Sequence, residues 1–372
     1  MDTRNQWLSL ALTPGLGPAT LKKLVQRFGS AQQILAANRK ALEECPFLRK
    51  DSLASLCDQK TIAKAADHEL RLAEKAGISL LCWDDPLFPS LLKEINDPPP
   101  ILYVLGSPQL LSAPGIAMVG ARAASSYGLQ VAERLAMELA RHDLVITSGF
   151  AMGVDTAAHR GALAAGGKTI AVMGCGLDII YPSQNKKLHG QIAAHGAIIS
   201  ESPLGTPPEG FRFPARNRII SGLSLGVVVV EAAHRSGTLI TAHQALEQGR
   251  DVFAIPGRID SPKSEGCHRL IQEGAKLVHN ATDILEELAL SAPAASPAEA
   301  KPQTQLLLPP EENKVFSLLE VYPRNIEEII QAAQLPAQRI TEILLHLELR
   351  GLVASLPGNQ YQRLAEPHAS SV

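Results

Sequence analysis

Three arginines and two phenylalanines lie within FRFPARNR, residues 211–218, although the chain of 372 residues has only 8 Phe and a formal net charge of -2. Arg212, Arg216 and Arg218 carry guanidinium groups, which form bidentate contacts with phosphates. The ring of Phe213 can stack on an unpaired base, an interaction worth roughly 1 to 3 kcal/mol per base. Because a duplex hides the faces of its bases, this combination predicts a site for single-stranded nucleic acid.

A structural interpretation of the same segment is also open. Arg216 and Asn217 could brace the start of a helix over RIISGLS, residues 218–224. Pro214 fixes the backbone between the ring of Phe213 and the arginines that follow it, which favours the binding interpretation.

Glycine and arginine follow the first of several predicted strands, in VGARAASSYG. Gly120 allows a close approach of the backbone, Arg122 projects from the turn, and Ser125 or Ser126 can cap the next helix. Only Gly120 matches a dinucleotide-binding fingerprint, and Arg122 stands where such a site needs a small residue. This departure argues against an NAD site.

Two further loops after predicted strands could present backbone amides to a phosphate. Gly149 and Gly153 flank the turn of SGFAMGVD, although the same glycines could instead permit tight packing of strand against helix. In RSGTLITA, the amides of Ser236, Gly237 and Thr238 could hold an anion while Ser236 or Thr238 caps the helix.

The aromatic residue of a fourth loop, GCGLDIIYP, has two interpretations. Tyr181 could stack on a base or could pack over its own loop. The four loops contain no nucleophile and base pair, no nucleophile elbow, no zinc-protease helix and no P-loop. The residues therefore favour a binding protein over an enzyme, with no metal and no organic cofactor.

Bulk properties predict a cytoplasmic protein. No segment approaches the roughly 20 consecutive apolar residues of a membrane span, and the N-terminus, with Asp2 and Pro14, does not read as a signal peptide. The five cysteines are odd in number and lack a C-x-x-C pair, so they fit reduced thiols rather than disulfides or a zinc site.

The elements that position these loops form an α/β pattern. Apolar runs rich in β-branched residues alternate with helical stretches, and several are apolar at every position, as in strands buried on both faces of a parallel sheet. This predicts an extended Rossmann-like, doubly wound parallel sheet. The expected strands are residues 115–120, 143–149, 168–174, 196–201, 226–232, 251–257 and 275–280.

Three domains are expected. Residues 1–75 read as a small helical domain of the SAM or helix-hairpin-helix type, in which PGLGPATLKKLVQRFG is either a phosphate-binding turn or an ordinary helix-helix turn. The α/β domain covers 76–288, and an Ala/Pro/Ser-rich linker covers 289–310. Three helices and two strands over 311–365 predict a winged helix, followed by a tail, 366–372.

The motifs VGAR, SGFAMGVD, AVMGCGLDIIYP, FPARNRIISGLS and VVVVEA followed by RSGTLITA and GRDVFAIPG resemble the Smf/DNA-processing protein A family of bacteria. The resemblance implies a homodimer that binds single-stranded DNA without cleaving it. Such proteins act in natural transformation: they protect incoming strands, relieve inhibition by single-strand-binding protein and help to load the RecA recombinase.

The resemblance also assigns roles. Arg122 and the arginines of FPARNR would hold the phosphate backbone, Phe213 would contact a base, and Lys168 of GGKTIAVMG would add a cation. The loops at Gly149 to Gly153 and Ser236 to Thr238 would supply amides.

Two other classes of function remain as alternatives. A nucleotide hydrolase of the lysine-decarboxylase-like Rossmann group matches only at Gly237 and Thr238, and position 241 is Thr rather than Glu. A duplex-binding transcription regulator would use the winged helix, but residues 311–364 hold seven acidic against five basic residues. We therefore expect the winged helix to mediate mainly protein contacts or to assist DNA binding weakly.

Overall fold

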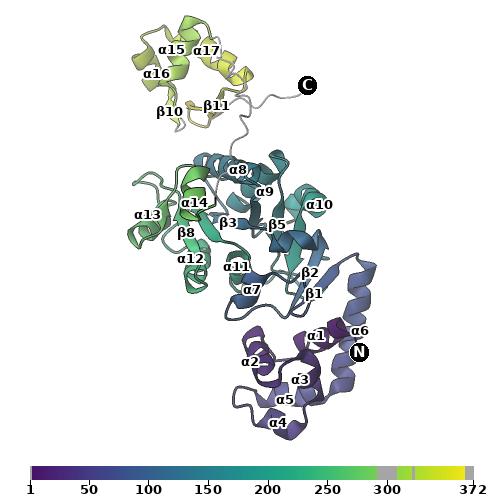
Figure 1. The fold of residues 1–372 in the computed structure, drawn as a ribbon. Helices are drawn as coiled ribbons and strands as arrows, with labels where there is room; N and C mark the ends of the chain where they lie inside the picture. The colour runs from purple at the N-terminus through teal and green to yellow at the C-terminus, as the bar shows by residue number, and fades with distance from the viewer. Residues whose placement is uncertain (1, 291–307, 321–322, 365–372) are drawn as a thin grey trace. The chain divides into compact units, whose positions relative to one another are not determined.

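The computed structural model describes residues 2–290, 308–320 and 323–364. The chain forms two compact units, residues 1–292 and 293–372, and each is described by itself (Figure 1). The predicted linker, 289–310, falls mostly outside the described residues, and the predicted tail, 366–372, falls wholly outside them.

Six helices precede the first strand, as the sequence predicts for this region. Pro18 occupies the first turn of α2, where its missing N–H costs no hydrogen bond. The rings of Trp7 on α1 and Trp83 lie 5.1 Å apart, and Trp7 Nε1 donates to Asp84 at 2.7 Å, so α1 packs directly on the sheet domain. The helices are α1 (Thr3–Ala11), α2 (Pro18–Phe28), α3 (Ala31–Ala36), α4 (Arg39–Glu43), α5 (Lys50–Cys57) and α6 (Gln59–Lys75).

A nine-stranded sheet follows, in the order β1-β2-β6-β5-β4-β3-β7-β8-β9. The seven predicted strands are confirmed as β3 to β9, and they run parallel. Two strands that the sequence did not predict, β1 and β2, extend this sheet at one edge, where they pair antiparallel. The strands are β1 (Ser79–Cys82), β2 (Ile101–Gly106), β3 (Gly115–Gly120), β4 (Val145–Ser148), β5 (Thr169–Val172), β6 (Ala197–Ser200), β7 (Gly226–Val230), β8 (Asp251–Ala254) and β9 (Lys276–Leu277).

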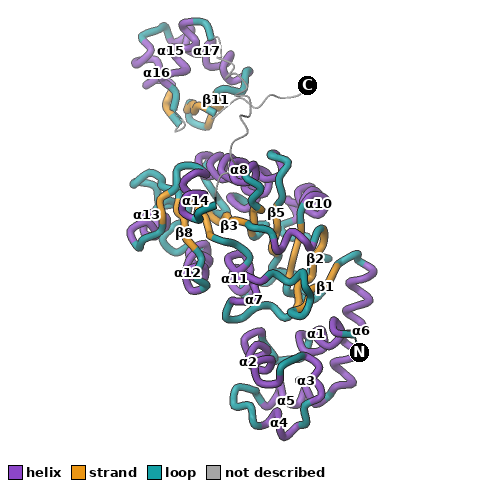
Figure 2. Tube along the Cα trace, viewed as in Figure 1, coloured by secondary structure: helices purple, strands orange, loops and turns teal. Residues whose placement is uncertain are grey.

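Helices cover both faces of the sheet, as Figures 1 and 2 show. Ile116 and Met118 of β3 belong to the core beneath α8 and α9, whereas Ala117 and Val119 belong to the core beneath α11 and α12. This alternation explains why the strand is apolar at every position. The helices of this domain are α7 (Ser90–Glu94), α8 (Ser126–Arg141), α9 (Val154–Ala164), α10 (Lys186–His195), α11 (Arg212–Gly222), α12 (Gly237–Glu247), α13 (Glu265–Gln272) and α14 (Ala281–Glu287), with short 3-10 turns η1 (Pro108–Ser112) and η2 (Ser183–Asn185).

The strand order reverses between β3 and β7. Chain connections from these two neighbouring strands lead to opposite sides of the sheet, so their carboxyl ends border the crevice in which open α/β sheets bind ligands. The loop after β3 borders this crevice, and the loops after β4 and β5 follow it along the same end of the sheet.

The second unit has the predicted winged-helix order. Three helices pack around their own apolar core, which includes Val315, Ile329 and Leu344, and a three-stranded sheet has the order β10-β12-β11. The elements are α15 (Pro310–Leu318), β10 (Arg324–Asn325), α16 (Ile326–Ala333), α17 (Ala337–Leu349), β11 (Val353–Leu356) and β12 (Gln360–Arg363).

Candidate nucleic-acid interface

A cavity of about 70 Å³ lies at the carboxyl ends of β3, β4 and β5. We call it the strand-end pocket, and its lining includes Arg122, Gly149, Tyr181, Phe213 and Arg216. Arg122 and Phe213, which the sequence selected from segments 91 residues apart, therefore meet at one site.

An aromatic pair and a cation belong to the lining of this pocket. The rings of Tyr181 and Phe213 stack with their centroids 5.8 Å apart and an interplanar angle of 27°. The guanidinium of Arg122 lies 5.3 Å from the centroid of Phe213. Arg122 is exposed, and Tyr181 keeps 44% of its surface accessible, so both can reach a ligand. Tyr181 packs on Phe213, which agrees with the packing interpretation, and stacking of its accessible ring on a base stays a prediction.

FRFPARNR is helical rather than a loop. α11 begins at Arg212, six residues earlier than the helix expected from the sequence, and Pro214 fits because it lies within the first turn. The expectation of a loop aromatic at Phe213 is therefore wrong. The helix instead holds Phe213 and Arg216, one turn apart, toward the strand ends.

Arg216 is almost completely buried, with 5% of its surface exposed. Its Nη1 donates to the carbonyl of Gly149 at 2.7 Å and to the carbonyl of Val172, and its Nε donates to Asn217 Oδ1 at 3.3 Å. Burial lowers the pKa of Arg216 to about 10. Arg216 thus ties together the ends of β4 and β5, and a direct contact of its guanidinium with phosphate stays a prediction.

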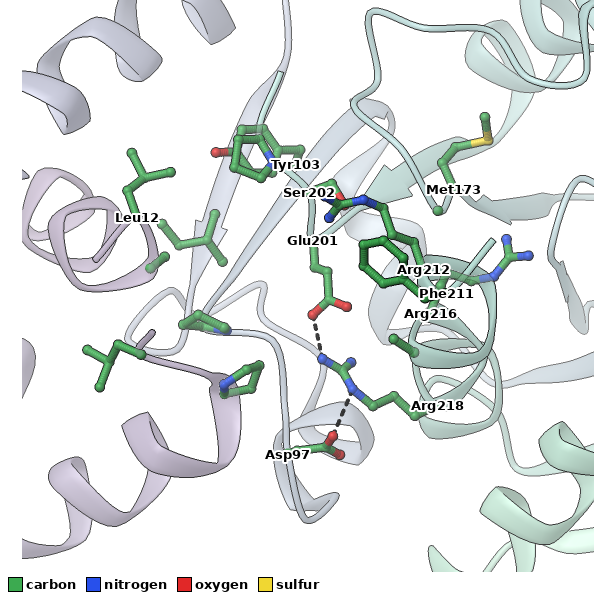
Figure 3. Close-up of a pocket in the computed structure, with 18 residues that line it drawn as sticks. Leu12, Asp97, Tyr103, Met173, Glu201, Ser202, Phe211, Arg212, Arg216 and Arg218 are labelled. Atoms are coloured by element: carbon green, nitrogen blue, oxygen red, sulfur yellow. Dashed lines mark hydrogen bonds and ion pairs between the residues drawn. The ribbon is translucent and has the colours of Figure 1, made fainter. Parts of the chain in front are cut away.

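Arg218 also faces the interior, between two carboxylates (Figure 3). Its Nε lies 3.0 Å from Asp97 Oδ2, and its Nη2 donates to Glu201. Burial raises the pKa of Glu201, and Arg218 acts in the opposite direction. The predicted phosphate contact of Arg218 is replaced by an internal ion pair that joins α11 to the end of β6.

Arg212 is the first arginine of the segment and makes different contacts from Arg216 and Arg218. Arg212 Nε pairs with Glu209 at 2.8 Å, and its guanidinium lies 5.0 Å from the centroid of the exposed Phe211 ring. About a third of the Arg212 side chain remains accessible, so it is the one arginine of this segment that faces solvent. A larger cavity of about 350 Å³, which Arg212, Phe211 and Glu201 help to line, lies beside it (Figure 3).

Three glycines of the predicted site have packing reasons for their identity. A Cβ on Gly120 would lie 1.9 Å from the carbonyl oxygen of Val230, and one on Gly149 would lie 2.6 Å from Arg216 Nη2. Gly153 has a φ of +83°, and a Cβ there would lie 2.3 Å from the carbonyl oxygen of Ala121. The packing interpretation of these glycines is therefore supported.

A buried carboxylate orders the loop between β4 and α9. Asp155 Oδ2 accepts from the amide of Ala151 at 3.1 Å, so this amide is already satisfied within the protein. Burial raises the pKa of Asp155, and the positive charge of Arg216 opposes this shift. His159, on the next turn, is fully buried with Nδ1 2.7 Å from Thr169 Oγ1, and burial lowers its pKa to about 3.

Side chains of the protein satisfy two other helix starts near this edge. Ser236 Oγ accepts from the amide of Thr238 at 3.2 Å, so Ser236 caps α12, as one of the sequence interpretations expected. Glu231 Oε2 accepts from the amide of Ser125 at 2.8 Å, and Ser125 caps α8. Within this loop the amide of Thr238, which was predicted to hold an anion, already donates to Ser236 Oγ.

Lys168 lies at the amino end of the parallel strands, opposite the carboxyl ends at which Arg122 lies. It precedes β5, whereas Arg122 follows β3, and the two strands run in the same direction. The cation that the resemblance assigns to Lys168 therefore lies away from Arg122, because parallel strands have their amino ends at one end of the sheet and their carboxyl ends at the other. The exposed Lys186 and Lys187 begin α10 soon after Tyr181, so they lie at the same end of the strands as Arg122. The sequence analysis did not predict these two lysines as site residues.

Across 2–290, 308–320 and 323–364, no helix is long and apolar enough to cross a membrane. Within the same residues, no group of three or more His, Cys, Asp or Glu side chains is placed to hold a metal ion.

Models of three protein domains match the chain. Residues 79–289 match DNA recombination-mediator protein A, residues 1–64 match a DprA-like N-terminal HHH domain, and residues 284–359 match a DprA winged helix domain.

Relatives of known name agree with these matches. Protein Smf of Synechocystis is 34% identical, over 96% of this chain and 98% of its own length. Protein Smf of Escherichia coli is 39% identical, over 81% of this chain and 84% of its own length.

Two solved structures share the fold. The X-ray structure of DNA processing protein A from Streptococcus pneumoniae superposes with a TM-score of 0.69 at 40% identity, covering 77% of this chain and 99% of that one. A structure of DNA processing protein A from Helicobacter pylori, whose title concerns its single-stranded DNA binding mode, gives 0.52 at 34% identity, covering 57% and 95%.

Proposed function

The chain belongs to the DNA recombination-mediator protein A family, and from this membership we propose that it binds single-stranded DNA, without turnover, in natural transformation. Its ligand would be incoming DNA in the cytoplasm, which it would protect. It would also relieve inhibition by single-strand-binding protein and help to load the RecA recombinase, acting as a homodimer.

The observation that carries the proposal is the arrangement of Arg122, Phe213 and Tyr181. An exposed guanidinium 5.3 Å from a ring suits a strand whose phosphate and base are both accessible. A duplex offers phosphates at its surface but keeps its base faces stacked inside. Two rings in the lining of the pocket therefore favour a single strand over a duplex.

Further cations lie near the same carboxyl ends of the strands, where they could contact successive phosphates of the DNA backbone. Arg212 is partly accessible at the start of α11, and Lys186 and Lys187 are exposed at the start of α10. Within the described residues, neither Lys186 nor Lys187 forms an ion pair. Their charges would add to affinity in a salt-dependent and sequence-independent way.

Arg216 and Arg218 would support this surface from below. By holding the ends of β4, β5 and β6 against α11, they fix the position of Phe213 without facing the ligand. We assign them a positioning role in place of the direct phosphate contacts expected from the sequence.

Fluorescence anisotropy tests the proposal, with a labelled oligothymidylate and a hairpin duplex of equal phosphate number as the two probes. We expect the oligothymidylate to bind at least about tenfold more tightly, because only its bases can stack. Equal affinity for both probes, or release of a free base from a nucleoside monophosphate, would contradict the proposal. RecA-dependent strand exchange on DNA coated with single-strand-binding protein tests the later steps.

A further inference from the structure

The cavity of about 350 Å³ beside Arg212 lies between the N-terminal helices and the sheet domain (Figure 3). We call it the Glu201 cavity. Leu12 and Leu16 line one wall, and Glu201, the residue after β6, lines another. Its volume falls within the range of pockets that enclose small ligands, about 300 to 1,000 Å³, whereas the strand-end pocket, at about 70 Å³, is smaller. The Glu201 cavity therefore has room for a flat ring system.

The Glu201 cavity adjoins the strand-end pocket. Met173, Gly174 and Arg216 line both of them. Met173 and Gly174 follow β5, and Glu201 follows β6, the neighbouring strand, so both cavities lie at the carboxyl ends of the parallel strands. A single strand that contacts the strand-end pocket can therefore place an adjacent nucleotide at the Glu201 cavity.

Arg218 lines this cavity and has one donor group without a partner. The residue is only 6% exposed, and Figure 3 shows its guanidinium between Glu201 and Asp97. Its Nε and Nη2 pair with these two carboxylates, but its Nη1 has no hydrogen-bond partner within the described residues. A buried donor without a partner destabilises a protein, so such groups call for an explanation. An acceptor atom of a ligand in the cavity would supply the missing partner.

Glu201 presents acceptor positions beside this donor. Its Oε2 accepts from Arg218 Nη2, whereas its Oε1 accepts no hydrogen bond from the described part of the chain, and 22% of the side chain remains accessible. A carboxylate only accepts hydrogen bonds, so its free positions require donors from a ligand. A ligand that satisfies both side chains needs one acceptor for Arg218 next to donors for Glu201.

The Watson–Crick edge of guanine has this pattern. Its O6 is an acceptor, which arginine commonly contacts, and the neighbouring N1–H and N2 amino groups are donors. A carboxylate can accept from both of these donors at once, whereas adenine and cytosine offer it one amino group and thymine offers one N3–H. Apolar side chains such as Leu12 and Leu16 can cover the faces of a base, as they do in pockets that hold an extruded nucleotide.

From this geometry we propose that the Glu201 cavity binds a guanine base of the bound single strand through its Watson–Crick edge. The choice of the strand as the source of the guanine rests on the proposed function. Arg218 Nη1 would donate to O6, and Glu201 would accept from N1–H and from the N2 amino group. The protein would then prefer strands that contain guanine, in addition to its sequence-independent contacts with phosphates.

Two labelled strands of equal length test the proposal with the full-length protein: an oligothymidylate, and the same strand with one central guanine. Fluorescence anisotropy at one salt concentration gives the ratio of their dissociation constants. We expect the guanine strand to bind about fivefold or more tightly, the discrimination that one bidentate base contact provides. Equal affinity, or a larger gain from a central adenine or cytosine, would overturn the proposal and leave the proposed function standing. If neither strand binds, the proposed function itself fails.

Glu201→Gln should lower this ratio to about one, because the side-chain amide can still accept from Arg218 but places a donor against the donors of guanine. Glu209→Gln is the matched control: Glu209 pairs with Arg212 at 2.8 Å and does not line the cavity, so the ratio should stay at the wild-type value. The ratio for each protein cancels any general loss of folded protein or of backbone binding. Equal ratios in the two variants would overturn the proposal.

A second variant leaves the ion pairs of Arg218 intact. Ala215 is exposed on α11 and lines the cavity, and leucine is a good helix former, so Ala215→Leu should fold and fill part of the cavity. We expect its ratio to fall at least twofold, and an unchanged ratio would count against the cavity.

Guanosine monophosphate distinguishes the other source of guanine. If it raises the unfolding temperature of the wild type but not that of Glu201→Gln, while both proteins bind the two strands equally, the cavity binds a free guanine nucleotide and the assignment to the strand is wrong.

Discussion

The rings of Tyr181 and Phe213 stack with centroids 5.8 Å apart, although the two residues belong to different loops and helices of the sheet domain. Tyr181 follows β5, and Phe213 lies in the first turn of α11. Their contact joins two aromatic residues from distant segments in the lining of the strand-end pocket. A base that stacks on either ring would extend an existing stack rather than create one.

Phe213→Ala should weaken binding of oligothymidylate by about fivefold or more, since one stacking interaction is worth roughly 1 to 3 kcal/mol. The slope of affinity against salt should stay close to that of the wild type, because no charge is removed. Anisotropy titrations at several salt concentrations measure both quantities. Phe211→Ala removes the neighbouring, 68% exposed ring, which does not line the strand-end pocket, and serves as the control. Equal losses in both variants would count against the Tyr181 and Phe213 surface.

Arg122→Ala should lower affinity and also reduce the salt slope by about 0.7, the value expected for one lost phosphate contact with a single strand. Lys168→Ala removes one exposed positive charge at the amino ends of the parallel strands and should change neither quantity. The same anisotropy titrations compare the two variants. A larger effect of Lys168→Ala than of Arg122→Ala would show that the DNA binds at the amino ends of the parallel β-strands.

Arg216→Ala should destabilise the fold. The change leaves the buried carbonyls of Gly149 and Val172 without their charged donor, and we expect the free energy of unfolding to fall by about 3 kcal/mol. Urea denaturation followed by circular dichroism measures this loss. Arg134→Ala is the control: Arg134 is an exposed arginine whose ion pair with Glu138 should contribute less than about 0.5 kcal/mol. If Arg216→Ala keeps full stability but loses DNA binding, Arg216 contacts the ligand after all.

The sequence predicted the strands that are buried on both faces, because continuous apolar runs leave little choice of element. β1 and β2 were missed for a physical reason: β2 directly follows Pro98, Pro99 and Pro100, and β1 is held in place partly by contacts between Trp83 and the helical domain. Such long-range packing leaves no local pattern.

Which residues belong to the site was easier to predict than whether each side chain faces the pocket or the protein interior. Arg122 and Phe213 do meet, but extending the helix back to Arg212 would have shown that Phe213 and Arg216 share a face, while Arg218 turns toward Glu201. Which arginine is buried depends on carbonyls and carboxylates of distant strands, which the sequence does not place. The position of Lys168 was available from the sequence, since it precedes its strand instead of following it.

The winged helix should contribute little to DNA binding. α17, its third helix, exposes Leu345 and Leu349, and its Arg339 is engaged by Glu311 at 2.9 Å and Glu342 at 3.0 Å. Ending the chain after residue 290 should therefore change affinity for a duplex or a single strand by less than about threefold. Anisotropy with both probes checks this. A loss of tenfold or more on the duplex would instead indicate a DNA-reading domain.

His159 should make the stability of the sheet domain depend on pH below neutrality. Its pKa is about 3 in the folded protein, chiefly because it is buried and to a lesser degree because of the charge of Arg216, whereas an unfolded histidine titrates near 6.5. Between these values the unfolded chain binds the additional proton, so stability is fully present above about pH 6.5 and falls as the pH drops toward 3. One such group contributes about 1.4 kcal/mol per pH unit.

His159→Asn isolates this effect, because an amide can keep the hydrogen bond to Thr169 Oγ1 but does not titrate. Urea denaturation between pH 6.5 and 4 should show a steeper loss of stability in the wild type than in His159→Asn. Carboxylates such as Asp155 and Glu201 are present in both proteins, and their raised pKa values act in the opposite direction, since they favour the folded state at low pH. Parallel pH profiles for the two proteins would mean that His159 becomes protonated without unfolding, and hence that water reaches its ring.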